Sequence, residues 1–165
     1  MFDKGEYVVY GSKGICEVRD VTTLNMDGAA KNRLYYVLCP SGKRESKIFV
    51  PVDSDKTIMR RVITGQEAEE LIQKIPDIQE IRVEDDKLRE EKYKECMRTC
   101  ECKDWVRIIK TLRVRIQKRL AQGKKITVTD ERYFRIAEDN LYSELSLALK
   151  IPKEQLEQYI TDHLK

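Results

Sequence analysis

Cysteine is the residue type in this chain most able to bind a metal or act as a nucleophile. Three of the five cysteines lie close together, as Cys96, Cys100 and Cys102. Structural zinc sites usually combine two short Cys pairs, or one pair with histidines, and no second half lies near this cluster. An odd number of cysteines without an export signal favours reduced cytosolic thiols over a disulfide framework. We therefore expect no bound metal; a metal protein built on these thiols is the alternative, and a zinc assay would decide it.

The sequence offers few residues that are suited to acid–base catalysis. The single histidine, His163, is the third residue from the end of the sequence, in a region where we expect the chain to fray. The seven glycines are scattered in turn-like positions and form no phosphate-binding loop. The carboxylates alternate with Lys and Arg on predicted helices, where solvent-exposed pairs are the usual outcome. We expect neither enzyme activity nor a cofactor.

Positive charge gathers in the middle of the chain. Residues 86–128 carry 14 Lys and Arg against 6 Asp and Glu, whereas residues 1–85 carry 13 against 15 and residues 129–165 carry 5 against 8. Such a basic region predicts contact with an anionic partner, most often nucleic acid, or else a solvated helix surface. The candidate phosphate ligands are Arg89, Lys92, Lys94, Arg98, Arg113, Lys118, Lys124 and Lys125. Because glutamates are interspersed at 90, 91 and 95, any promoter DNA contact should be weak and independent of sequence.

The elements that must position these residues fall into two groups. Short β-branched and aromatic runs at 7–10, 15–23, 34–38 and 48–52 are separated by turn residues, which favours a small, strongly bent antiparallel barrel of the SH3 or Tudor kind. From residue 65 the apolar period changes to that of helices. No apolar run is long enough to cross a membrane, and no signal peptide is indicated after Met1.

The predicted helices cover 67–75, 86–100, 104–122, 129–149 and a last segment from 152, with a linker near 76–86. Asp104 and Thr129 are the expected N-caps. Trp105 falls on the apolar stripe of its helix, so we expect it to pack in the core. The fold class is therefore α+β: a small SH3/Tudor-like antiparallel β-barrel over 1–65, followed by an all-α helical domain over 66–165.

Four motifs in the β-region carry a resemblance to a known family. The segments GEYVVY at 5–10, GICEV at 14–18, YYVL at 35–38 and IFVPV at 48–52 occur in order and at matching separations. They resemble the RNA-polymerase-interacting domain of the CarD/CdnL transcription regulators, a module also similar to one in the transcription-repair coupling factor. The helical half resembles the CarD pattern in length and helix order.

The resemblance implies a non-catalytic bacterial protein, cytoplasmic and recruited to the nucleoid through RNA polymerase. In the family, the β-domain docks on the protrusion lobe of the polymerase β subunit, strand against strand. On this sequence the docking edge would comprise Thr23, Leu24, Asn25 and Met26, with Phe49 alongside. Studied relatives carry arginines at the positions of Leu24 and Phe49, so docking here would depend on backbone pairing more than on ion pairs.

The resemblance also implies a role at the open promoter complex, with one departure. Several family members place a tryptophan wedge in the DNA minor groove at a position that is Arg89 in this sequence. Two functions therefore stay open. One is a polymerase-tethered regulator that stabilises the open complex through weak DNA-backbone contacts. The other is a protein–protein adaptor on polymerase without DNA contact.

Overall fold

The computed structural model describes residues 2–23, 33–43 and 45–163. The chain divides into two compact units, Met1–Val62 and Ile63–Lys165, called here the β-unit and the helical unit. None of the described helices has the length and apolar character that crossing a membrane requires.

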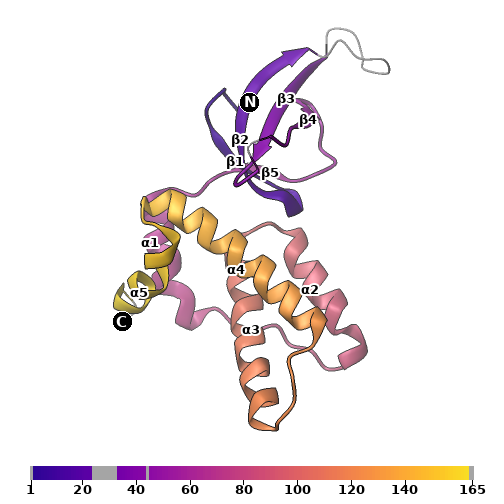
Figure 1. Cartoon of the computed structure of the whole chain (residues 1–165), viewed down its shortest axis with the longest axis vertical. Helices are drawn as coiled ribbons and strands as arrows, with labels where there is room; N and C mark the ends of the chain where they lie inside the picture. The colour runs from indigo at the N-terminus through magenta and orange to yellow at the C-terminus, as the bar shows by residue number, and fades with distance from the viewer. Residues whose placement is uncertain (1, 24–32, 44, 164–165) are drawn as a thin grey trace. The chain divides into compact units, whose positions relative to one another are not determined.

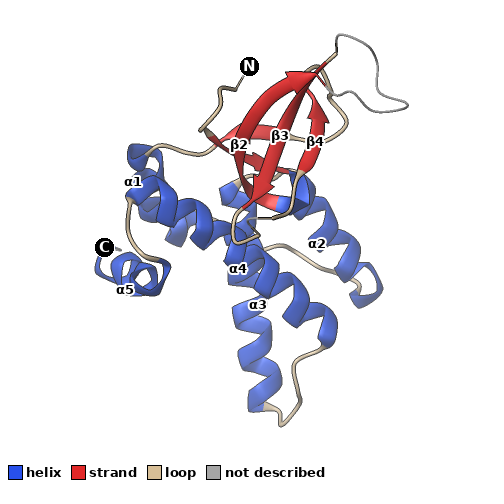
Figure 2. Ribbon diagram, turned by 45° about the horizontal axis from the view of Figure 1, so that its top comes forward, coloured by secondary structure: helices blue, strands red, loops and turns tan. Residues whose placement is uncertain are grey.

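The β-unit is a five-stranded antiparallel sheet. Its strands are β1 (Tyr7–Tyr10), β2 (Gly14–Thr23), β3 (Leu34–Pro40), β4 (Ile48–Pro51) and β5 (Met59–Arg61). They are ordered β4-β3-β2-β1-β5, and the long strands β2 and β3 curve in Figure 2. The arrangement confirms the predicted fold class, a Tudor-like β-domain followed by helices. The fifth strand was not predicted; it forms by pairing with β1.

One face of the sheet holds the core of the β-unit. Fully buried Val8, Cys16, Val18 and Leu38 pack together with Tyr36 and Val50. A β-bulge interrupts the β2–β3 pairing between Val18 and Asp20, and beyond it Asp20 pairs with Val37 and Thr23 with Leu34. The bulge keeps Val21 against the core cluster.

The helical unit comprises α1 (Gly65–Lys74), α2 (Arg89–Arg98), α3 (Cys102–Ala121), α4 (Val128–Leu149) and α5 (Lys153–His163), with short 3₁₀ turns at Ile75–Asp77 and Asp86–Leu88. The longest helices, α3 and α4, pack against each other (Figure 1). Trp105 is 1 % exposed on α3, which confirms the prediction that it packs in the core.

Both predicted N-caps are wrong by a few residues. Thr127 caps α4, because its hydroxyl oxygen accepts the Asp130 N–H at 3.1 Å, and Thr129 lies inside the first turn. The N-cap of α3 is Glu101. Asp104 lies in the first turn instead, where its carboxylate accepts the Thr99 hydroxyl and faces the positive end of the helix.

The segment predicted as a linker, 76–86, is bonded to α3. The Lys110 ammonium donates to the carbonyls of Ile75 at 2.8 Å and Ile78 at 2.6 Å. The Thr111 hydroxyl accepts the Ile81 N–H at 2.8 Å. These bonds satisfy backbone groups that follow α1 and hold the segment within the helical unit.

A buried carboxylate fixes the start of the helical unit. Glu144 of α4 is fully buried, and its two oxygens accept the Ile63 N–H at 2.9 Å and the Cys102 thiol at 3.1 Å. Directly after Ile63, Thr64 and Glu67 form a reciprocal capping box at the beginning of α1. The first residues of the unit are thus held by side chains far along the chain.

Candidate functional site

The outer half of β2 has an unpaired edge among the described residues. On one side, β3 pairs with β2 as far as Thr23. On the other side, β1 pairs only with residues 14–17, and the chain before it reaches Val18, whose N–H donates to the Glu6 carbonyl at 2.8 Å. Within residues 2–23, 33–43 and 45–163, no strand pairs with this side of β2 after Val18.

Backbone groups of two residues face this open edge. The Leu34 carbonyl accepts the Val52 N–H at 3.0 Å, so the backbone of Leu34 faces β4. Its partner Thr23 must therefore direct its own N–H and carbonyl away from β3. Two residues earlier, the Val21 N–H donates to the side chain of Asp20 at 2.9 Å rather than to β3. Val21 and Thr23 thus present main-chain groups along the edge.

The face opposite the core carries an exposed aromatic ring. Phe49 pairs with Val37 across β3 and β4, on the side away from the buried residues Tyr36 and Val50, and is 43 % exposed. The structure thus places Phe49 outside the core. An apolar side chain exposed on the same sheet can add specificity to a partner that docks by strand addition, by contacting it across this face.

The predicted docking residues are only partly within the described structure. Thr23 is the last residue of β2, and Phe49 lies on β4, two strands away. Leu24, Asn25 and Met26 lie outside the described residues. Residue patterns did not identify Val21, because its exposure to the edge follows from the bulge before it.

Four of the eight predicted DNA ligands on the helical unit are engaged by side chains. Arg89 bonds to Asp86 through Nε at 3.1 Å and a terminal nitrogen at 3.0 Å. The other three have longer ion pairs, which are Lys92–Glu95 at 3.9 Å, Lys94–Glu91 at 3.5 Å and Arg113–Glu138 at 4.0 Å. The positive charge of each of these four side chains is thus balanced by a neighbouring carboxylate.

The other four predicted ligands are exposed and have no ion pair among the described residues. Arg98 lies at the end of α2; Lys118, Lys124 and Lys125 lie at the end of α3 and in the turn after it. Arg119 ties this turn to α3, because its Nε donates to the Lys125 carbonyl at 3.0 Å. The end of α3 and the turn after it therefore carry three exposed cations without a carboxylate partner among the described residues.

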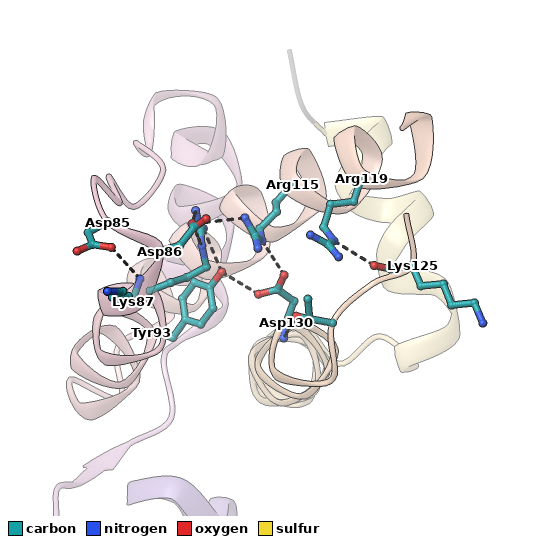
Figure 3. A network of polar contacts seen from close by, with 10 residues as sticks. Asp85, Asp86, Lys87, Tyr93, Arg115, Arg119, Lys125 and Asp130 are labelled. Atoms are coloured by element: carbon teal, nitrogen blue, oxygen red, sulfur yellow. Dashed lines mark hydrogen bonds and ion pairs between the residues drawn. The ribbon is translucent and has the colours of Figure 1, made fainter. Parts of the chain in front are cut away.

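A closed ring of five side chains joins the beginnings of α2 and α4 to α3 (Figure 3). Arg115 Nε donates to one oxygen of Asp130 at 2.7 Å, and the Tyr93 hydroxyl donates to the other at 3.1 Å. Arg89 donates to the Tyr93 oxygen at 3.3 Å. Asp86 closes the ring by accepting Arg89 and lying 3.9 Å from Arg115. Residue spacing did not predict this ring.

Burial divides the ring into an inner and an outer part. Tyr93 is fully buried and Asp130 is 1 % exposed, whereas the Asp86 side chain is 78 % exposed. Burial, with the charge of Asp130 beside it, raises the pKa of Tyr93. Hydrogen bonds and charge from Arg89, then the charge of Arg115, lower the pKa of Asp86. The ring therefore holds a neutral phenol inside and an ionised carboxylate at the surface.

The clustered cysteines point to different partners. Cys96 donates to the Asp104 carbonyl at 3.2 Å, and Cys102 contacts Glu144. Burial raises the pKa of Cys96 to about 12 and that of Cys16 in the β-unit to about 11. In the part of the chain that the structure describes, no three His, Cys, Asp or Glu side chains are grouped as metal ligands.

Sheet and helices together define a two-unit protein with a Tudor-like β-domain and an open strand edge. The family model of the CarD-like/TRCF RID domain matches residues 2–63. The match spans the whole sheet and ends where the helical unit begins. No curated protein matches the chain.

Proposed function

We propose that this protein is a bacterial transcription regulator without catalytic activity that docks on RNA polymerase through its β-unit. The match of residues 2–63 to the CarD-like/TRCF RID domain supports transcription and RNA polymerase as the general setting. The particular contact proposed is with the protrusion lobe of the β subunit. The observation that carries it is the open edge of β2, where Val21 and Thr23 direct their backbone groups outward.

Strand addition is the mode of binding that this edge favours. An incoming strand would pair with the N–H and carbonyl groups of Val21 and Thr23 and continue along Leu24, Asn25 and Met26. Main-chain pairing supplies affinity, while side chains beside the edge select the partner. Asp20 would release the Val21 N–H at little cost, because that hydrogen bond is exposed to water.

The helical unit is proposed to stabilise the open promoter complex through weak contacts with DNA phosphates. The exposed, unpaired cations Arg98, Lys118, Lys124 and Lys125 support this role. Four such contacts give little affinity alone, since each phosphate contact weakens as salt rises. Tethering to polymerase raises the local concentration of DNA and makes weak contacts effective. The protein would act in the cytoplasm, on the nucleoid.

A specific observation favours a second function, that of an adaptor without DNA contact. Arg89, Lys92, Lys94 and Arg113 already have carboxylate partners within the helical unit. If the helices bind a protein, association with promoter complexes should change little with salt. A steep fall in binding as salt rises would favour DNA contact.

Polymerase docking is tested with the full chain and the isolated protrusion lobe. Phe49→Ser removes an aromatic side chain that is 43 % exposed; Tyr7→Ser on β1, 42 % exposed, is the matched control. We expect Phe49→Ser to weaken binding about tenfold or more, as loss of an interface anchor does, and Tyr7→Ser to change it little. Equal effects of both substitutions, or no binding by the folded wild-type chain, would contradict docking at this edge.

A further inference from the structure

Two arginines from different helices converge on one exposed carboxylate of the helical unit. Arg89 begins α2 and donates two hydrogen bonds to a single oxygen of Asp86, at 3.0 and 3.1 Å. Arg115, from the second half of α3, places a terminal nitrogen 3.9 Å from the same oxygen. Figure 3 shows Arg115 reaching both Asp86 and Asp130 from α3.

The arginines are fixed and the carboxylate is not. The side chains of Arg89 and Arg115 are 18 % and 23 % exposed, and their other hydrogen bonds go to Tyr93 and Asp130, which are buried. Asp86 is 78 % exposed and lies on a 3₁₀ turn of three residues. Turning Asp86 out into water would leave the Arg89–Tyr93–Asp130–Arg115 part of the ring intact.

We propose that Arg89 and Arg115 form a seat for a phosphate group of the nucleic-acid backbone, which Asp86 occupies as an internal competitor. This inference deepens the proposed function and rests on its DNA-contacting role for the helical unit. Guanidinium groups suit phosphate oxygens because they offer several N–H donors in a plane and stay charged. A phosphodiester would replace one singly charged oxygen ligand with another and add no buried charge.

The surroundings favour a polymer over a small anion. Arg119 follows Arg115 by one helical turn, and its Nε holds the loop that carries the exposed Lys124 and Lys125. Lys118 is exposed on the same helix end. One phosphate in the seat would thus have further cations within reach of neighbouring phosphates, which free phosphate cannot use.

The test measures binding of the full chain to a short DNA duplex by fluorescence anisotropy over a range of salt. Asp86→Asn removes the negative charge that faces Arg89 and Arg115. Glu84→Gln makes the same charge change at an exposed position two residues earlier and serves as the control. We expect Asp86→Asn to bind about threefold more tightly than Glu84→Gln, a gain of the size that one exposed ion pair controls. The DNA affinity of Asp86→Asn should fall more steeply with salt than that of Glu84→Gln, by an amount that corresponds to about one more phosphate contact. Equal affinity of the two variants would overturn the proposal.

Adding Arg89→Gln to Asp86→Asn should abolish the gain, and a gain that persists would also overturn it. The Nε–H signals of Arg89 and Arg115 in nitrogen-15 NMR spectra should shift on adding duplex. They should stay unchanged with inorganic phosphate at the same phosphate concentration. An equal response to inorganic phosphate would assign the seat to a small anion and refute the DNA reading.

Polymerase binding is measured separately on the same proteins, so that failure of the phosphate-site proposal can be distinguished from failure of the docking proposal. Intact polymerase binding with no difference between Asp86→Asn and Glu84→Gln refutes the seat and leaves docking standing. A gain for Asp86→Asn in a chain that does not bind the protrusion lobe supports the seat and refutes docking.

Discussion

The two units differ in whether their polar groups are bonded within the unit or left open at its edge. The β-unit leaves main-chain groups of Val21 and Thr23 at an open edge while its core is almost entirely apolar. The helical unit instead buries two carboxylates that are bonded within it: Asp130 accepts Arg115 and Tyr93, and Glu144 accepts the Ile63 N–H. Substitutions at polar positions should therefore separate binding from stability, affecting binding in the first unit and stability in the second.

Loss of Asp130 should have the largest effect. Asp130→Ala removes the buried partner of Arg115 and Tyr93, and breaking a buried pair by removing one member is strongly destabilising. We expect the free energy of unfolding, measured with urea, to fall by about 3 kcal/mol. The neighbouring Glu131→Ala, which removes only an exposed pair with Arg135, should cost less than about 1 kcal/mol. Equal losses for the two variants would show that the ring does not hold the helices together.

At the open edge, Thr23→Pro should impair binding without unfolding the sheet. Proline removes the outward-facing N–H of Thr23, and proline is tolerated at sheet edges. We expect polymerase affinity to fall by about 2 kcal/mol while the urea midpoint changes little. Thr22→Pro is the control, since Thr22 pairs with Tyr35 and directs its N–H to β3; it should destabilise the sheet instead. If both variants unfold the β-unit alike, the edge is structural and the contrast with the helical unit is lost.

Alkaline pH should lower the folding stability of the helical unit, by less than the loss of Asp130 does. Burial raises the pKa values of Tyr93 and Tyr142 above the ordinary 10.0, so the folded protein retains those protons at pH values where the unfolded chain loses them. This contribution is fully present below pH 10 and is lost as pH rises through the folded pKa values. Each such tyrosine lowers stability by up to about 1.4 kcal/mol per pH unit in that window.

Tyr93→Phe is the variant that isolates this effect. It should cost about 1 kcal/mol at neutral pH, where Asp130 loses a hydrogen-bond donor. It should also make urea midpoints measured between about pH 9 and pH 11 fall less steeply than in the wild type. An unchanged alkaline slope would mean that Tyr93 does not retain its proton in the folded state.

Sequence patterns sufficed for the elements whose apolar residues repeat over several turns or strands. The α3 stripe predicted the burial of Trp105, and the runs around Val8, Val37 and Val50 predicted their strands. Strand β5 escaped prediction because Met-Arg-Arg at 59–61 has no strand signal of its own and depends on pairing with β1. Thr127 and Thr129 are equally suitable as N-caps from their residue type alone. In the structure Thr127 caps α4, and Asp130, whose N–H it accepts, contacts Arg115 and Tyr93.

The geometry of the candidate site could not be predicted from the sequence. Resemblance pointed to the end of β2 and to Phe49, yet which backbone groups face outward follows from the Val52–Leu34 hydrogen bond. In the helical unit, charge counting named Arg89 but not Arg115. Arg89 and Tyr93 are one turn apart on α2, but Arg115 and Asp130 lie on other helices, so only the packing of α2, α3 and α4 brings the four side chains together.

The β-bulge after Val18 also determines how β2 tolerates changes in length. Before it, the core-facing residues of the strand are even-numbered, Cys16 and Val18; after it they are odd-numbered, beginning with Val21. Deleting Arg19 would remove the extra residue of the bulge and make the alternation regular, with Val18 and Val21 still toward the core and Asp20 toward water. Deleting a residue within the regular part of the strand would instead turn the core-facing side chains on one side of the deletion toward water. The bulge is therefore the place at which β2 can lose one residue and keep both of its parts in phase.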